Sequence, residues 1–230
     1  ISAGDRRSPI GRRRSNTLMR IGIDARELSG HATGVGRYLT GLLREWCNRA
    51  SPALHEFVLY TPEALSAPLD SRRFRHRVVA GAAGTWWEQA QLPRAAAEDH
   101  LDAFFAPAYT APIRLDVPIV LTIHDLSYVA HPEWFRLREG FRRRWLTRQS
   151  ARQARTIITV SAFSRREIVE HLGQPEDRIV VIPQGIDLPK ASGSRRDATP
   201  RVLYVGSVFN RRHVPELIHA VATLARTRPD

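Results

Sequence analysis

The sequence predicts an open α/β domain, a doubly wound parallel sheet with helices on both faces. Short apolar segments alternate with segments of helical periodicity along most of the 230 residues, which is the pattern of strands joined by crossover helices. Several expected strands are apolar on both faces, as strands buried between two helical layers must be. A hydrophobic content of 43% and a charged content of 25% fit an ordinary globular chain with its own core.

The expected strands are short runs rich in aliphatic and aromatic residues, bounded by turn-forming residues. In chain order they are Arg20–Asp24, Glu56–Thr61, Val78–Ala80, Leu101–Ala106, Pro118–His124, Arg155–Val160, Arg178–Ile182 and Arg201–Gly206.

The first helix is predicted by apolar residues at spacings of three and four, which place them on one face. These residues are Val35, Tyr38, Leu39, Leu42, Leu43 and Trp46. Further helices are expected at Trp87–Asp99 with a kink or break at Pro93, at Glu133–Gln153, from Ser164 to Gly173, and at Val214–Leu224. The Ser164 start rests on a capping-box spacing with Glu167, and Gly173 is a typical helix end.

The organisation of the chain is expected to have four parts. Residues 1–18 are rich in Arg, Ser, Gly and Pro without the apolar core of a secretory signal, so we interpret them as a leader or tag; a basic nucleic-acid-binding arm is the alternative. Residues 19–183 form the α/β domain, and 184–200 are a Pro-, Gly- and Ser-rich linker. One strand and one helix in 201–230 cannot bury their apolar faces alone. They either pack on the first domain or open a second, truncated one.

Composition and charge limit the functional classes. No run of about 18 apolar residues occurs, so no membrane-spanning helix is expected. The single cysteine, Cys47, excludes a disulfide framework and favours a cytoplasmic location. The net charge of +12 is concentrated as +4 in residues 1–18 and +7 in Arg136–Arg155. A basic nucleic-acid-binding module is therefore an alternative function, but a nearly neutral remainder gives no reason to expect a nucleic-acid partner.

Ligands of open α/β sheets bind outside the carboxyl ends of the strands, and polar residues at two such places are candidates. Gly34 and Gly36 lie at the entry to the first helix, where exposed amides suit a phosphate; the alternative is two turn and helix-start glycines. His124 and Asp125 directly follow an apolar strand and could move or orient a proton. The alternative is that Asp125 caps the next segment and His124 packs in a turn.

Tyr109 lies on the loop after the strand Leu101–Ala106, at the same edge, and is a candidate to line the ligand cleft together with Arg37 and Ser161. No second histidine or cysteine lies at ligand spacing from His124, so no metal is expected. The glycine pattern also fails the dinucleotide fingerprint, because no glycine occupies position 39, and this disfavours a dinucleotide-dependent oxidoreductase.

The arginine-rich helix has two interpretations. Its aromatic residues Trp134, Phe141 and Trp145, with Leu137, share one face. The favoured interpretation is a core-facing aromatic side and a solvated arginine side. The alternative is a helix whose Arg136–Arg155 stretch makes peripheral contact with an anionic membrane surface.

Eight segments, taken together and in order, resemble the family-4 glycosyltransferases of the GT-B fold, in particular the mannosyltransferase-like bacterial group. The segments are RIGIDAREL, TGVGRYL, WWEQAQLP, DAFFAPAYTAP, VLTIHDLSYVAHPEWF, ARTIITVSAFSRREIVEHLG, RIVVIPQGID and RVLYVGSVFNRRHVPELIHAV. They cover nearly everything from Met19 to Leu224.

The resemblance implies two Rossmann-like domains, an acceptor-side domain followed by a domain that binds a nucleotide-diphosphate sugar. It implies transfer of a hexose, with mannose favoured, to a glycan or lipid-linked acceptor with retention of configuration. The nucleotide sugar is a co-substrate, and no metal or other cofactor is expected. A lipid-linked acceptor would place the protein at the inner face of the membrane.

The resemblance also implies roles for single residues. Gly34 and Gly36 match the glycine-rich loop at the donor diphosphate, and His124, with Asp125 beside it, matches a histidine near the transferred sugar. Arg212 stands where relatives carry a lysine on the diphosphate, and Gln184 replaces a usual asparagine. The family's paired glutamates would fall beyond residue 230, so the chain is expected to be a fragment without turnover of its own. A non-catalytic regulatory α/β module is the remaining alternative.

Overall fold

The structure is a computed structural model that describes residues 18–30, 34–48, 55–65, 74–135, 137–188, 202–206, 208 and 212–227. The chain forms two compact units, Ile1–Gly185 and Ile186–Asp230, which are described separately. The predicted leader, apart from Leu18, lies outside the described residues, as do Arg136, Arg201 and residues 189–200 of the predicted linker.

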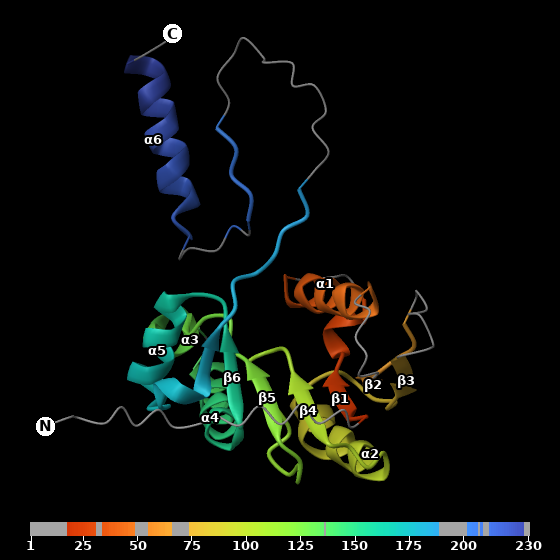
Figure 1. Ribbon diagram of the computed structural model, residues 1–230. Coiled ribbons are helices and arrows are strands. Elements are labelled where there is room, and N and C mark those ends of the chain that lie inside the picture. The colour runs from red at the N-terminus through yellow and green to blue at the C-terminus, as the bar shows by residue number, and fades with distance from the viewer. Residues whose placement is uncertain are drawn as a thin grey trace, which may run out of the picture. The chain divides into compact units, whose positions relative to one another are not determined.

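The first unit is built on a seven-stranded sheet in which all neighbouring strands are parallel, in the order β3-β2-β1-β4-β5-β6-β7 (Figure 1). The strands are β1 Arg20–Asp24, β2 Glu56–Thr61, β3 Phe74–Val78, β4 Ala103–Ala106, β5 Ile119–Thr122, β6 Thr156–Thr159 and β7 Ile179–Val181. The order of the strands reverses between β1 and β4, so a crevice is expected at the carboxyl ends of these two strands.

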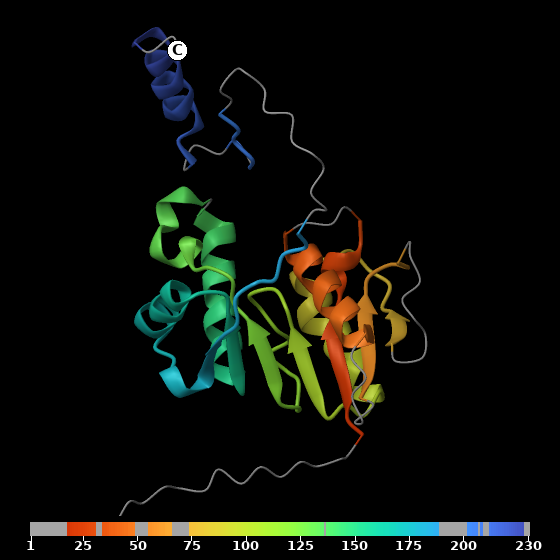
Figure 2. The same ribbon diagram turned by 45° about the horizontal axis from the view of Figure 1, so that its top comes forward.

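Helices cover both faces of this sheet, as the sequence predicts. In the first unit they are α1 Gly34–Asn48, α2 Leu92–Glu98, α3 Ser127–Ala130, α4 Leu137–Gln153 and α5 Ala162–Leu172. One face packs on α1, whereas α2 and α4 lie on the other (Figure 2). The unit therefore has the Rossmann-like α/β fold.

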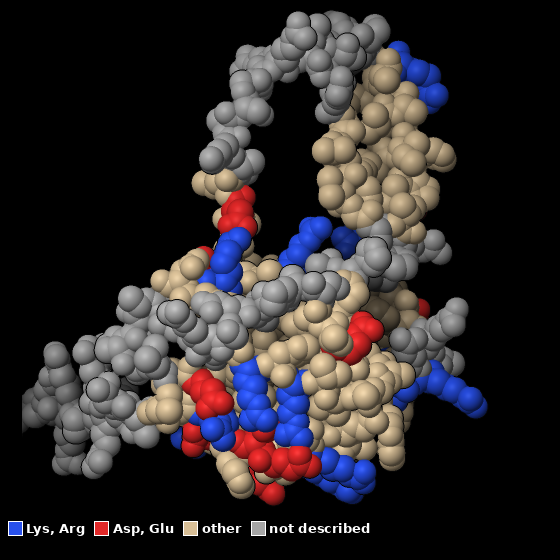
Figure 3. All heavy atoms as spheres, turned by 90° about the vertical axis from the view of Figure 1, so that its right-hand side faces the viewer, with Lys and Arg blue, Asp and Glu red and all other residues tan. Residues whose placement is uncertain are grey.

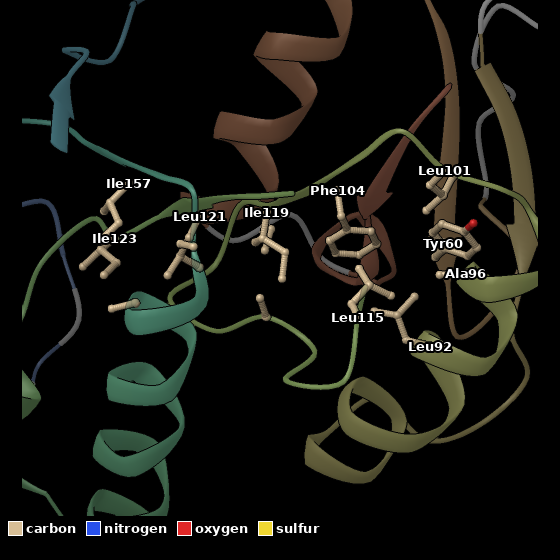
Figure 4. Packing of buried hydrophobic residues seen from close by; sticks show 14 of the residues in the cluster. Tyr60, Leu92, Ala96, Leu101, Phe104, Leu115, Ile119, Leu121, Ile123 and Ile157 are labelled. Atoms are coloured by element: carbon tan, nitrogen blue, oxygen red, sulfur yellow. The ribbon is translucent and has the colours of Figure 1, made fainter. Parts of the chain in front are cut away.

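Two apolar cores hold the layers together. Leu39 and Leu43 of α1 bury against Ile23 of β1 and Leu59 of β2. The larger core lies on the other face, between the strands and α2, α4 and α5. Figure 4 shows its central residues, which are Tyr60, Leu92, Ala96, Leu101, Phe104, Leu115, Ile119, Leu121, Ile123 and Ile157. Burial of this apolar area contributes about 25 cal/mol per Å², and it is the main contribution to the stability of the packed sheet and helices.

A cluster of charged side chains lies at the β3 side of the sheet. Asp99, at the end of α2, accepts hydrogen bonds from Tyr60 at 2.6 Å and Arg77 at 2.6 Å, and pairs with Arg75 at 3.1 Å. Figure 3 shows the basic and acidic side chains interleaved on this side of the molecule. Burial alone would raise the pKa of Asp99, but the hydrogen bonds from Tyr60 and Arg77 outweigh it and lower that pKa below its ordinary value.

Two expected boundaries differ near β3 and α2. The strand expected at Val78–Ala80 lies four residues earlier, at Phe74–Val78, because its arginines alternate outward on an edge strand and hide the apolar pattern. The helix expected at Trp87–Asp99 does not break at Pro93. A π-helical turn, Trp87–Gln91, runs directly into α2, and Pro93 is the second residue of α2, directly after the change of helix type.

Two further helices begin at other residues than expected. The helix predicted from Glu133 is interrupted, since a 3₁₀ turn at Pro132–Trp134 is followed by extended Phe135 before α4 begins at Leu137. Ser164 is not a helix start: α5 begins two residues earlier, at Ala162, and the Ser161 hydroxyl caps it by accepting from the Ser164 amide at 3.0 Å.

The predicted core-facing aromatic side of α4 is wrong. Phe141 is 68% exposed and Trp145 is 49% exposed, whereas the buried positions of the helix carry Leu146 and small residues. These small residues are Gly140, Thr147, Ser150 and Ala151. Small side chains let the helix approach the sheet closely, which turns the aromatic residues outward.

The second unit contains one helix within the described residues, α6 Val214–Thr227. The strand expected at Arg201–Gly206 is not formed, because residues 202–206 have no strand partner in the described chain. No helix among the described residues is long and apolar enough to span a bilayer.

Candidate functional site

A pocket of about 390 Å³ lies at the carboxyl edge of the sheet, at the β1–β4 reversal. Its walls come from the segment after β1, the start of α1, the turn before the π-helical segment, the segment after β4, and α4. The lining residues are Arg26, Glu27, Val35, Gly84, Thr85, Glu88, Ala108, Tyr109, Thr110, Arg142, Arg143 and Leu146. This volume suits a small molecule.

His124 lies beside this pocket, at the end of the loop that leaves β5. Its Nε2 lies 3.0 Å from the Pro107 carbonyl, and its Nδ1 lies 3.2 Å from the Gln184 amide nitrogen. A carbonyl can only accept and an amide nitrogen can only donate, so these contacts fit a neutral ring with its proton on Nε2. Burial lowers the pKa of His124, which favours the same neutral form.

The His124 ring is held between two tyrosines. Tyr38 of α1 makes an edge contact with it at 4.9 Å between ring centroids, and Tyr109 makes another at 5.5 Å. Tyr109 also lines the pocket, so this one side chain lies between the His124 ring and the pocket. The backbone of Tyr109 has φ of 63°, a left-handed conformation that a tyrosine rarely adopts.

Asp125 makes the local contacts of a cap. Its Oδ1 accepts from the Ser127 amide at 3.0 Å and the Ser127 hydroxyl at 2.8 Å, at the start of α3. Its Oδ2 accepts from the Tyr109 hydroxyl at 3.0 Å. Burial first, and Asp125 next, raise the pKa of Tyr109, so this hydroxyl stays a donor at neutral pH. Asp125 therefore orients Tyr109 and the turn after His124.

A buried set of charges forms the floor of the pocket. Arg26 lies 2.7 Å from Asp24 and 2.5 Å from Glu88, whose same oxygen accepts from the Thr110 hydroxyl at 2.5 Å. The Asp24 Oδ2 atom lies outside hydrogen-bond geometry, so its contact with Arg26 is an ion pair. Burial raises the pKa of Asp24 to about 6, although the Arg26 charge opposes the shift.

Arginines of α4 form the opposite wall. The Arg143 guanidinium lies over the rings of Tyr109 at 4.9 Å and Tyr128 at 4.3 Å. Arg142 is exposed, and within the described chain it has no hydrogen-bond or ion-pair partner. The helix is tied to the segment after β4 by buried Ser150, whose hydroxyl accepts from the Ala111 amide at 3.0 Å and donates to its carbonyl at 3.3 Å.

The structure brings some of the predicted site residues together and not others. His124, Asp125 and Tyr109 are in mutual contact. Ser161 caps α5, whose Ser164 donates to the His124 carbonyl at 3.1 Å. Gly34 and Gly36 begin α1, next to pocket-lining Val35, and Arg37 is exposed on the same helix. Arg212 is exposed in the second unit.

Sequence reasoning missed the Arg26–Glu88 pair and the pocket arginines. Of the adjacent Trp86 and Trp87, only Trp87 is buried, while Trp86 is 72% exposed. A glutamate next to a buried tryptophan was the available clue to Glu88. Among the described residues, one group has ligand atoms close enough for a metal, Glu167, Glu170 and His171 of α5, and none of these lines the pocket.

Residues 32–190 match the sequence model of glycosyltransferase family 4. The chain belongs to this family. A 124-residue stretch, half of this chain, is 35% identical to glycogen synthase of Mycobacterium tuberculosis and covers 28% of that protein. A 131-residue stretch, again half of the chain, is 33% identical to D-inositol 3-phosphate glycosyltransferase of Nocardiopsis dassonvillei and covers 30% of it.

This family-4 chain thus spans less than a third of the length of these curated relatives. Among solved structures it is similar to Anabaena HepE, determined in complex with UDP and glucose, with a TM-score of 0.50 and 19% identity. That similarity covers 74% of this chain and 45% of HepE, and it supports the GT-B-type Rossmann-like fold.

Proposed function

We propose that the protein is a glycosyltransferase that moves a hexose from a nucleotide-diphosphate sugar to a glycan or lipid-linked acceptor with retention of configuration. Mannose is the favoured hexose, from the resemblance to the mannosyltransferase-like group. Membership of family 4 supports the transfer. The observation that carries it is the neutral His124 beside a pocket at the β1–β4 reversal, where an open α/β sheet binds its ligands.

The contacts of His124 support a positioning role. Its Nε2 proton is engaged by the Pro107 carbonyl, so the ring has no free proton to give on that side. Its Nδ1 faces the side chain of Gln184, which is exposed. A substrate hydroxyl that replaces Gln184 would donate to Nδ1 and be oriented by it. His124 would then orient a sugar or acceptor hydroxyl without being an obligatory base.

The donor diphosphate would be bound by the amides at the start of α1, near Gly34 and Gly36. For Arg212, in the second unit, a role at the diphosphate is implied by the resemblance alone. Amides at a helix start and a guanidinium both stabilise the negative charge that develops as the glycosidic bond stretches. The acceptor hydroxyl would attack on the same face of the sugar and pass its proton to a donor phosphate oxygen. Arg37 and Ser161 are expected to line the acceptor side.

A panel of GDP-, UDP- and other nucleotide sugars, assayed for transfer by the chain extended to the length of its family-4 relatives, tests this proposal. In that protein His124→Ala should lower kcat about 100-fold with a smaller change in KM, because misplaced reacting groups cost mainly turnover. His131→Ala is the matched control, since His131 is exposed and outside the pocket lining. Full activity of His124→Ala would contradict the role of this ring.

The outer face of α4 supports a contact with an anionic membrane surface as a second part of the proposal. Exposed Phe141 and Trp145 lie among exposed Arg138, Arg142 and Arg148. Aromatic rings favour the headgroup region, and arginines favour anionic lipids. Vesicles with phosphatidylglycerol should therefore cosediment the protein, and vesicles of phosphatidylcholine should not. If a double variant with Phe141→Ser and Trp145→Ser still cosediments with the phosphatidylglycerol vesicles, the contact is not made through this face.

A further inference from the structure

The charges around the pocket are unevenly balanced. On the floor, Arg26 is matched by Asp24 and Glu88, with both carboxylates within 2.7 Å of its guanidinium. On the α4 wall, Arg142 and Arg143 face the same space, and no described carboxylate lies within ion-pair distance of either. Glu27 also lines the pocket, so the side opposite α4 carries more carboxylates than guanidinium groups, whereas the α4 wall is basic.

The two arginines of the wall differ in how they are held. Arg143 is stacked on Tyr109 and Tyr128, which fixes the plane of its guanidinium at the pocket. Arg142 is exposed at the rim without a described partner. A fixed guanidinium beside a free one is an arrangement suited to a small anion with several oxygens, since each guanidinium can donate two parallel hydrogen bonds.

The floor is suited to a different part of a ligand. Glu88 is nearly fully buried, and one of its oxygens already accepts from Arg26 and Thr110. Thr85 and Thr110 line the pocket next to it. Carboxylate and hydroxyl groups at this end can exchange hydrogen bonds with the hydroxyls of a sugar or polyol.

We propose that this pocket binds the acceptor, and that the acceptor is a phosphorylated sugar or polyol whose phosphate lies between Arg142 and Arg143. Its hydroxyls face Glu88, Thr85 and Thr110. The inference rests on the proposed transferase function for calling the ligand an acceptor. The shared chemistry, a phosphate ester of a polyhydroxylated group, fits a free metabolite as well as the headgroup of a polyprenyl phosphate sugar.

The position of the pocket fits an acceptor. Tyr109 lines the pocket and also contacts the His124 ring, so a ligand in this space lies one side chain away from the histidine. The pocket belongs wholly to the first unit. Binding of the phosphate ester is therefore measurable on the purified chain without a donor sugar.

Isothermal titration calorimetry with glucose 6-phosphate, glucose and UDP tests the inference, and a polyprenyl phosphate sugar in neutral detergent forms the lipid arm. Glucose 6-phosphate should bind and glucose should not. Arg142→Gln should weaken that binding about tenfold, the cost of one charge-assisted hydrogen bond. Arg152→Gln is the control, because the Arg152 side chain is exposed on the same helix but does not line the pocket. Arg142 has no described partner, so its replacement leaves the fold intact.

The outcomes separate the sources of the phosphate and the two proposals. Arg142-dependent binding of glucose 6-phosphate identifies a free metabolite, and such binding of the polyprenyl phosphate sugar but not of glucose 6-phosphate identifies a lipid-linked acceptor. If neither binds, or if Arg142→Gln and Arg152→Gln bind equally, the inference is overturned. UDP binding that displaces glucose 6-phosphate would also overturn it, because the pocket would then hold the donor. Arg142-dependent binding, without transfer from any nucleotide sugar by the chain extended to the length of its family-4 relatives, would reject the transferase function alone.

Discussion

The hydroxyl of Ser164 donates a hydrogen bond of 3.1 Å to the backbone carbonyl of His124, which lies 40 residues earlier in the chain. The first turn of α5 thereby fixes the backbone of the residue that follows β5. The side chain of His124 is fixed separately, by the Pro107 carbonyl and two tyrosine rings. Backbone and ring are thus held by different elements of the fold.

Ser164→Ala should lower the free energy of unfolding by about 1 kcal/mol, because a buried carbonyl loses its partner. It should also bring the pKa of His124 back towards 6.5, since a looser turn admits water to a ring whose pKa burial lowers. Chemical denaturation and NMR titration of the histidine measure the two effects. Thr40→Ala removes a similar hydroxyl-to-carbonyl bond on α1 and should leave the titration unchanged. An unchanged His124 titration in Ser164→Ala would show that the bond does not hold the ring.

Ser161→Ala should destabilise the protein by about 1 kcal/mol, the usual cost of losing an N-cap side chain. The Ser164 amide would lose the Ser161 oxygen at 3.0 Å. Glu167→Ala is the informative comparison, because the sequence pattern predicts it as a capping partner whereas the structure places it inside α5. It should change the free energy of unfolding by less than about 0.5 kcal/mol. Equal losses in both variants would favour the capping box predicted from sequence.

Asp99→Asn should destabilise the protein by about 2 kcal/mol at pH 7, because Tyr60, Arg75 and Arg77 all lose a charged partner. The lowered pKa of Asp99 means that its contribution is present above the unfolded pKa and is lost as pH falls through the folded one. The difference from wild type should therefore shrink as the solution is acidified below about pH 4. Thermal unfolding at several pH values measures it.

Glu98→Gln is the control for that experiment. Glu98 also contacts Arg77, but its side chain is 70% exposed, so its loss should be small at every pH. A pH-independent cost of Asp99→Asn would contradict a contribution from its carboxylate charge.

Asp24→Asn should gain stability relative to wild type as pH rises. The folded-state pKa of Asp24 is raised to about 6, so the protonated form favours folding and this contribution is lost as pH rises through about 6. Asparagine does not ionise and escapes this loss. The advantage of the variant should grow by up to about 3 kcal/mol between about pH 4 and pH 7. Urea denaturation of both proteins across this range checks it, and parallel curves would refute the raised pKa.

The sequence predicted the sheet, β1, β2 and the placement of His124 and Asp125 because each depends on local patterns. Apolar runs mark buried strands, and residues directly after them must lie at one edge. The β3 strand was misplaced because Arg75, His76 and Arg77 interrupt its apolar pattern at an open edge, where ionic contacts with Asp99 replace burial.

The pocket floor and the orientation of α4 could not be predicted from local patterns. Arg26 and Glu88 are 62 positions apart, and their pairing exists only once the β1 and α2 segments pack together. On α4, the aromatic residues are more hydrophobic than the small ones, so the sequence pattern predicts that the aromatic side faces the core. The small residues face the sheet because tight packing there excludes large rings, and Ser150 gains a buried partner at Ala111.

Ser150 and Ala111 connect two walls of the pocket. Ala108, Tyr109 and Thr110 form one wall and directly precede Ala111, while Arg142, Arg143 and Leu146 form the other on the helix that carries Ser150. The two backbone segments are thus joined by hydrogen bonds between buried partners. Because these bonds belong to the fold itself, ligand binding would not have to supply the free energy of bringing the two segments together.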